Sequence, residues 1–446
     1  MVLLTKFKEQ LKSSPMVRDT VVTTIFATSG RGIGFLIPFF IAAWYGVGKE
    51  TDAFFFAYSL IIYLATIFSP VMESIMVPFI AEKRANREDV GAFVGQVLGF
   101  SAIGLLLLSG IFMLVIKPIL TVSTRFSPEG LELIYGLLLE TIPLLVLLVW
   151  TSILAGTLNA YKVFVIPAIS PAFRAIATLG FIYAFKEPMG VHAIAWGYVI
   201  GEIFRLVILF WLLQKLNFIR LRVCLTFSRN HPRVTGFSEF LKTSSYQLLG
   251  MSVAAFTPVI NKTMASWLGK GSVSILEYAD RLYMIPLTFL ASGFMVTFLS
   301  HWSDRYQTSG EKQLQQDVRR AVYYGAGLSG ILTVFLLLFN TPIVAAVYGY
   351  GEFPKNQIPV VALVFGFYLF SVPPYFLTQL YARAFLTRKD TKTLLLISAI
   401  KTAGTIGFNL LLIRSMGLAG IALATTIVTF ITLGISSYLF HTRKST

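Results

Sequence analysis

The sequence consists largely of apolar segments that are long enough to cross a lipid bilayer. A helix of about 20 apolar residues spans the hydrocarbon core of a membrane. Twelve such segments occur, at approximately residues 21–47, 54–80, 90–116, 131–158, 163–185, 190–214, 241–268, 273–300, 321–348, 357–382, 393–413 and 417–440. Because they use most of the 446 residues, the connections are short. We therefore expect an all-α polytopic membrane protein with about twelve transmembrane helices.

The composition supports this fold class and argues against several functions. Hydrophobic residues make up 56% of the chain and charged residues 13%, whereas soluble domains carry about 25% charged residues. The single cysteine, Cys224, excludes a disulfide framework and a thiolate metal cluster, and the four histidines lie in or beside loops. The chain has no ATP-binding loop and no loop cluster of catalytic side chains. We therefore expect a protein that is not an enzyme and that uses no metal or cofactor.

The net charge of +16 comes mainly from Lys and Arg in alternate connections. With the N-terminus in the cytoplasm, the cytoplasmic segments hold 24 of the 37 Lys and Arg, and the outer loops hold 7. Cytoplasmic loops of membrane proteins typically show this bias. It predicts that both termini are cytoplasmic, with residues 1–20 as an amphipathic lead-in rather than a signal peptide. The charge is thus explained without a nucleic-acid partner.

An internal repeat divides the chain into two halves. Residues 172–181 and 399–408, offset by 227, share an Ala, a basic residue, a Thr and a final Gly-Phe. Six-helix units repeated in the same orientation form parallel lobes. We expect lobes at 21–214 and 241–440 around a central cavity, joined by a basic linker at 215–240 and followed by a cytoplasmic tail at 441–446. This arrangement is typical of alternating-access transporters.

Several charged residues lie within the predicted spans, where each costs about 2.5–3.5 kcal/mol at a helix centre. Glu202 and Arg205 share a helix face and are expected to form a structural pair, and Glu277 precedes Arg281 by one turn in the order that favours an ion pair. The other cations outnumber the acids and suggest a cavity for an anion such as phosphate or pyrophosphate. The candidate cations are Arg31, Arg174, Lys262, Arg281 and Lys401. The alternative is that they snorkel, or pair with Glu73 and Glu140, which are also candidates for binding a coupling ion.

Short motifs along the chain resemble those of the MurJ/MviN lipid II flippases. They are Tyr-Gly-Val-Gly-Lys-Glu-Thr-Asp-Ala-Phe-Phe at 45–55, Val-Pro-Phe-Ile-Ala-Glu at 77–82, Gly-Ser-Val at 271–273 with Tyr-Ala-Asp-Arg-Leu-Tyr at 278–283, and the segments 383–385, 390–393 and 417–425. The resemblance runs from about residue 25 to 440. It implies a flippase that moves a polyprenyl-pyrophosphate-linked sugar across the bacterial cytoplasmic (inner) membrane by alternating access. Arg31, Asp52, Asp280 and Arg281 match family positions, which makes Asp52 and Asp280 further coupling or pairing carboxylates.

Three departures from the family pattern concern the substrate. Ile37 and Pro38 replace an Arg-Asp pair of the first helix, Ala65 and Thr66 stand where the second helix usually carries an arginine, and two further spans are missing. We expect the substrate to be lipid II or a related lipid-linked oligosaccharide for cell-wall or surface-polysaccharide synthesis. The alternative is an ion-coupled small-molecule or multidrug exporter of the same fold. We expect a monomer in contact with membrane lipids. The sequence leaves open whether a coupling ion takes part in transport.

Overall fold

The chain folds into helices, as the apolar segments predict. The computed structural model describes residues 30, 32–215, 248, 256–388 and 390–442, and the regular secondary structure of that part is helical throughout. Eight of its helices are long and apolar enough to cross a membrane, and a shorter apolar helix covers Gly32–Tyr45. The prediction of an all-α polytopic membrane protein is therefore confirmed. Arg31, the lead-in 1–20, residues 216–240 of the predicted linker and the tail from 443 lie outside the described residues.

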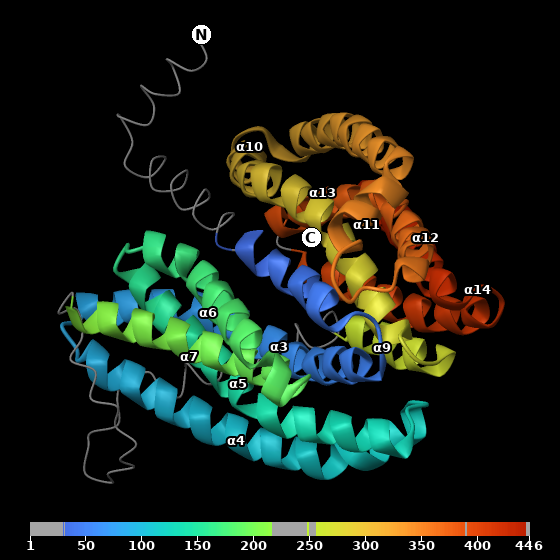
Figure 1. The fold of residues 1–446 in the computed structure, drawn as a ribbon. Helices are drawn as coiled ribbons and strands as arrows, with labels where there is room; N and C mark the ends of the chain where they lie inside the picture. The colour runs from blue at the N-terminus through green and yellow to red at the C-terminus, as the bar shows by residue number, and fades with distance from the viewer. Residues whose placement is uncertain (1–29, 31, 216–247, 249–255, 389, 443–446) are drawn as a thin grey trace, which may run out of the picture. The chain divides into compact units, whose positions relative to one another are not determined.

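Five long helices follow the helix Gly32–Tyr45. They are α3 (Lys49–Ala85), α4 (Val90–Ser123), α5 (Pro128–Ala160), α6 (Val165–Met189) and α7 (His192–Lys215), shown in Figure 1. Each corresponds to one predicted span between residues 54 and 214. A lipid-exposed backbone must satisfy its own hydrogen bonds, so a long apolar segment forms a helix. Even Pro70 and Pro78 lie inside α3 without ending it.

The second half contains short and long helices. They are α9 (Thr257–Ala265), a 3₁₀ turn (Ser266–Leu268), α10 (Ser272–Leu338), α11 (Asn340–Tyr348), a 3₁₀ turn (Lys355–Gln357), α12 (Ile358–Leu369), α13 (Val372–Thr387) and α14 (Thr391–Thr442). Gly310 in α10 has a φ of 72° and Gly417 in α14 a φ of 57°. Glycine adopts this region without steric penalty, so each of these helices is divided near the expected loop between two spans.

Two predicted spans contain interruptions. The span expected at 321–348 is wrong at its end, because α10 stops at Leu338 and the backbone leaves the helical region at Phe339 (φ −105°, ψ 15°) before α11 begins. The span expected at 357–382 is split between α12 and α13. Prolines occupy the first turn of α13, where a missing N–H is tolerated, whereas a helix interior would lose a hydrogen bond there.

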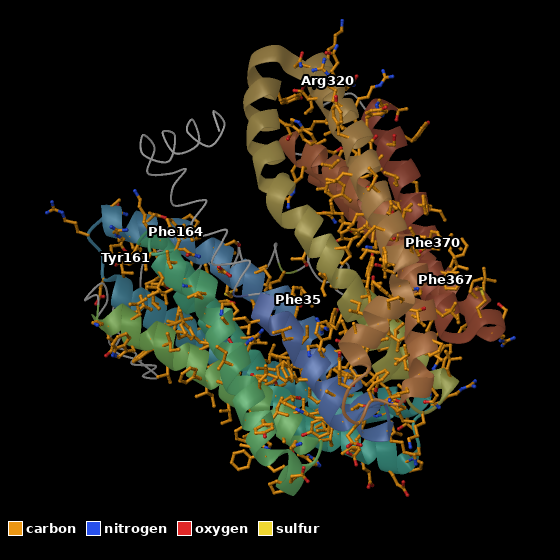
Figure 2. All side chains as sticks on the ribbon, turned by 45° about the horizontal axis from the view of Figure 1, so that its top comes forward. Phe35, Tyr161, Phe164, Arg320, Phe367 and Phe370 are labelled. Carbon is orange, nitrogen blue, oxygen red and sulfur yellow. The ribbon has the colours of Figure 1, made fainter. Side chains whose placement is uncertain are left out.

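Large apolar side chains lie on the outside of the helices. On α4 they include Leu106, Leu107, Ile111, Leu114 and Val122. Phe370, labelled in Figure 2, is 49% exposed between α12 and α13. A helix that is apolar on its exposed face as well as its buried face is typical of a membrane span.

The chain groups into two compact units. The first comprises Met1–Ile37, Ala57–Leu120 and Glu132–Met251, and the second comprises Pro38–Phe56, Thr121–Leu131 and Ser252–Thr446. This grouping differs from a single division at 215–240, since residues 38–56 and 121–131 fall in the second unit. Within the first unit, α6 and α7 run side by side (Figure 1).

Candidate functional site

Two cations share one buried carboxylate in the second unit. Glu277 of α10 lies 2.6 Å (Oε2) from Nζ of Lys262 on α9, and 2.6 Å (Oε1) from Nη2 of Arg281 one turn further along α10. Lys262 also donates a hydrogen bond to the carbonyl of Phe55 (3.2 Å). The side chains of Lys262 and Glu277 are 9% and 3% exposed, whereas that of Arg281 is 29% exposed. Of the two cations, Arg281 therefore offers the larger surface to a ligand.

Asp280 completes this cluster. It is half-buried on α10 and interacts electrostatically with Glu277, Arg281 and Lys262. The four side chains carry two positive and two negative formal charges when all are ionised. The local ion pair expected from the spacing of Glu277 and Arg281 is confirmed. The sequence analysis named Lys262 as a candidate for binding an anion. In the structure it forms an ion pair with Glu277 and a hydrogen bond to the carbonyl of Phe55.

Asp52, at the start of α3, is bound to the start of α10. Its Oδ1 accepts hydrogen bonds from the backbone N–H (2.7 Å) and Oγ (2.6 Å) of Ser274, and its Oδ2 accepts one from the N–H of Gly271. Gly271, with a φ of 86°, immediately precedes the helix. Carboxylates are stabilised at helix N-termini by the free N–H groups and by the helix dipole. Asp52 therefore has a structural role that needs no ligand.

Lys401 of α14 has a different environment. Its Nζ lies 5.5 Å from the ring centroid of Tyr375 on α13, a geometry that permits a cation–π interaction. It forms no ion pair with a carboxylate of the described residues. No acidic side chain of that part therefore pairs with Lys401.

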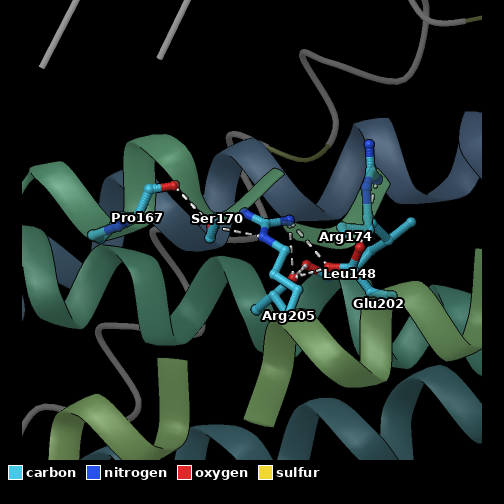
Figure 3. A network of polar contacts seen from close by, with 7 residues as sticks. Leu148, Pro167, Ser170, Arg174, Glu202 and Arg205 are labelled. Atoms are coloured by element: carbon cyan, nitrogen blue, oxygen red, sulfur yellow. Dashed lines mark hydrogen bonds and ion pairs between the residues drawn. The ribbon is translucent and has the colours of Figure 1, made fainter. Parts of the chain in front are cut away.

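A second buried network lies in the first unit, and Figure 3 shows it at close range. Glu202 of α7 is fully buried, and its Oε1 accepts hydrogen bonds from Nη1 of Arg205 (3.0 Å) and Oγ1 of Thr151 on α5 (2.6 Å). Arg205 also donates from Nε to Oγ of Ser170 on α6 (2.9 Å) and from Nη1 to Thr151 (3.4 Å). The expected structural pair of Glu202 and Arg205 is confirmed, and it joins three helices.

Arg174 of α6 lies at the edge of this network. Its Nη1 is 3.5 Å from Oε2 of Glu202, at the limit of a hydrogen bond, and its Nε is buried without a hydrogen-bond partner. The side chain is 21% exposed. Its Nη2 lies 3.9 Å from the position that a Cβ would take at Gly34. Arg174 is therefore held close to Glu202 while most of its donors are unused by the described residues.

The two carboxylates expected to pair with these cations have other partners. Oε1 of Glu73 accepts a hydrogen bond from Nδ2 of Asn159 (3.3 Å). Oε1 of Glu140 lies 2.8 Å from Nδ1 of His192, and its Oε2 is buried without a hydrogen-bond partner. Neither glutamate forms an ion pair with a candidate cation in the described part of the chain.

Sequence reasoning missed the polar partners that complete these clusters. Thr151, Ser170, Asn159 and His192 lie on other helices than the charges they contact, and a sequence carries no local signal for such contacts. Among the residues that the structure describes, no group of three or more His, Cys, Asp or Glu side chains could hold a metal ion.

Comparison with known proteins gives a consistent match. The family model described as lipid II flippase MurJ matches residues 41–446. A relative named "Probable lipid II flippase MurJ" from Buchnera aphidicola subsp. Acyrthosiphon pisum is 26% identical over 442 residues, covering 96% of this chain and 84% of its own length. A solved lipid II flippase MurJ in an inward closed conformation has a TM-score of 0.78 at 22% identity, covering 95% of this chain and 88% of its own. An inward-facing MATE multidrug transporter has a TM-score of 0.75 at 15% identity, covering 95% and 97%.

Proposed function

The chain belongs to the lipid II flippase MurJ family, and from this membership we propose that it moves a lipid-linked sugar across the membrane. The observation that carries the proposal is the family match, which covers residues 41–446 and thus nearly all of the described helices. The substrate is a polyprenyl-pyrophosphate-linked sugar, either lipid II for peptidoglycan synthesis or a related oligosaccharide for a surface polysaccharide. Transport proceeds by alternating access of two six-helix lobes, and the protein is a transporter rather than an enzyme.

The pyrophosphate of such a substrate needs cationic side chains that are not fully neutralised inside the protein. Arg281 combines a fixed position on Glu277 with partial exposure. Lys401 and Arg174 keep charge that the described acids do not balance. Guanidinium groups bind phosphate oxygens through paired N–H donors. Arg31 and Arg281, which match the family motifs, are the first residues to test.

The setting in the cell follows from the family and the charge pattern. We propose a position in the bacterial cytoplasmic membrane with both termini inside, and the bias of Lys and Arg toward alternate connections supports this orientation. It acts as a monomer in contact with membrane lipids. A coupling ion or the membrane potential drives the cycle; one elementary charge gains about 2.3 kcal/mol per 100 mV.

An exporter of cationic drugs is the second candidate, and the described charges argue against it. The MATE transporter shares the fold at 15% identity, which carries no information on substrate. A cation-binding site needs an excess of carboxylates. Instead, the buried cluster around Glu202 has two arginines for one glutamate, and the cluster around Glu277 is balanced.

Complementation tests the proposal. The native lipid II flippase is depleted in a bacterial host, this chain is expressed, and growth is followed together with externally accessible lipid II. We expect rescue, and we expect Arg31→Ala and Arg281→Ala to abolish it at normal protein levels, while Lys49→Ala in the outer turn is nearly silent. Failure of the wild type at good membrane expression would exclude lipid II and leave another lipid-linked oligosaccharide. Full rescue by both arginine variants would refute their role in binding.

A further inference from the structure

We propose that Arg174 is an oxyanion-binding group of the first unit, which takes a phosphate or diphosphate through Nη2 of its guanidinium. The oxyanion comes either from the diphosphate of the lipid-linked substrate or from free inorganic phosphate, and the chemistry of the contact is the same. In the first case the inference rests on the proposed function and deepens it. In the second case it holds without it.

The two arginines around Glu202 differ in how their donors are used. Arg205 donates from Nε to Ser170 and from Nη1 to Glu202 and Thr151, so both edges of its head are engaged (Figure 3). Arg174 makes one contact, from Nη1 to Glu202 at 3.5 Å. Its Nε is buried without a hydrogen-bond partner among the described residues. A buried donor without a partner is usually explained by strain, an ordered water or an ion, and Nε of Arg383 is in the same state.

The charges around Arg174 are also unequal. Glu202 carries one negative charge and faces two arginines, which leaves one positive charge in excess. Its Oε1 is bound by Arg205 and Thr151, so Arg174 shares only Oε2. The other glutamates described above in the first unit, Glu73 and Glu140, bind Asn159 and His192 instead. A cation held out of water without a matching charge is costly, and an anion that reaches it relieves this cost.

The surroundings of Arg174 leave Nη2 as the end of its guanidinium that can meet an anion. Nη1 is directed at Glu202, and Nη2 lies 3.9 Å from the position of a Cβ at Gly34, where the helix has no side chain. Tyr58 and Tyr198 lie close enough to interact electrostatically with Arg174. The N–H groups of a guanidinium form charge-assisted hydrogen bonds with phosphate oxygens.

Arg205 has the opposite role. Its removal would leave Glu202 with Arg174 at 3.5 Å as its remaining cation and would remove the hydrogen bond between α7 and Ser170 of α6. Removal of Arg174 instead leaves the pair of Glu202 and Arg205 intact and electrically balanced. Arg174→Gln is therefore expected to fold at least as well as the wild type, which makes it a clean probe of binding.

The first experiment measures binding of inorganic pyrophosphate to the full chain purified in detergent, by isothermal titration calorimetry. Loss of a charge-assisted pair of hydrogen bonds is worth roughly 1.5–3 kcal/mol, so Arg174→Gln should weaken binding about 10- to 100-fold. Arg174→Lys keeps the positive charge but loses the guanidinium donors, so its affinity for pyrophosphate should lie between those of the wild type and Arg174→Gln. Gly34→Leu should weaken binding by filling the space beside Nη2. Gly180→Leu on the same helix as Arg174, where a Cβ meets nothing within 4 Å, is the matched control and should bind as the wild type.

The second experiment measures lipid II transport by the same variants in proteoliposomes. Pyrophosphate binding that depends on Arg174, together with loss of transport in Arg174→Gln, assigns the oxyanion to the substrate. Binding that depends on Arg174 with wild-type transport in the variant assigns it to free phosphate. If the wild type binds pyrophosphate but never transports lipid II, the proposed function fails and the site stands. If Arg174→Gln and Gly34→Leu bind pyrophosphate as tightly as the wild type, or if the wild type does not bind it, the inference is refuted.

Discussion

The cluster around Glu277 predicts that its members differ sharply in their contribution to stability. Glu277 is contacted by Lys262 through Oε2 and by Arg281 through Oε1, both at 2.6 Å. Lys262→Met removes one of two cations and leaves a closed pair of Glu277 and Arg281. Glu277→Gln removes the shared carboxylate and leaves two neighbouring cations without it. The carboxylate should therefore matter more than either cation.

The magnitudes follow from the contacts. Lys262→Met loses the hydrogen bonds of one charged group, to Glu277 and to the carbonyl of Phe55, which is worth about 1.5–3 kcal/mol. Glu277→Gln breaks a buried pair by removing one partner, which costs about 3–5 kcal/mol, and adds repulsion between Lys262 and Arg281. In the double variant Lys262→Met/Glu277→Gln, the repulsion is gone, and Arg281 is 29% exposed and can reach solvent. Its loss of stability should be smaller than that of Glu277→Gln alone.

The assay is unfolding of the purified chain in detergent, followed by tryptophan fluorescence, for the wild type and the three variants. The expected order of stability is wild type, Lys262→Met, the double variant and then Glu277→Gln. The interaction free energy of the cycle should exceed about 0.5 kcal/mol, the level at which contacting residues depart from additivity. Equal effects of the two single variants would refute the larger role of the carboxylate, and an additive double variant would show that Lys262 and Glu277 do not act as a pair.

Three further predictions concern single contacts. Asp52→Asn places an amide donor against the N–H of Gly271 and should cost about 2–3 kcal/mol, measured by the same unfolding assay; an unchanged stability would contradict the proposed anchoring of α3 on α10. Gly156→Val should destabilise the chain, because a Cβ at this position would lie 2.6 Å from the carbonyl oxygen of Glu73, and a wild-type unfolding curve would rule out this close approach of α5 to α3. Trp150→Phe removes a hydrogen bond of 3.1 Å to a carbonyl of α4 and should cost about 1 kcal/mol in the same assay, and an unchanged stability would show that this bond does not contribute.

The parts of this fold that could be predicted from the sequence depend on local properties. Apolar length alone located α3 to α7, because the bilayer requires long helices wherever apolar residues persist. The pairs Glu202–Arg205 and Glu277–Arg281 were predicted because residues three or four apart share a helix face. The boundary at Phe339 was missed, since apolar residues continue on both sides of it and hydropathy does not register a change in backbone direction.

For the candidate site, the sequence predicted which types of residue take part but not which residues contact each other across helices. Glu140 and His192 are 52 residues apart, and Asp52 and Ser274 are 222 apart. Such contacts depend on how helices pack, for which a single sequence gives no rule. The sequence therefore predicted the partners that lie on the same helix as a cation but not those on other helices, and it treated Lys262 and Arg174 as equivalent. Their surroundings separate them.

Pairing, rather than the number of basic residues, decides how much positive charge each unit offers to an anion. Both units contain a buried glutamate with one cation on its own helix and a second cation from a neighbouring helix. In the second unit the formal charge of Asp280 offsets the extra cation, and Arg281 is the partly exposed member of the cluster. In the first unit no such carboxylate is found among the described partners of the network, and the extra charge stays on Arg174. A substrate with a diphosphate would therefore gain from the charge of Arg174, although this residue lies outside the family motifs.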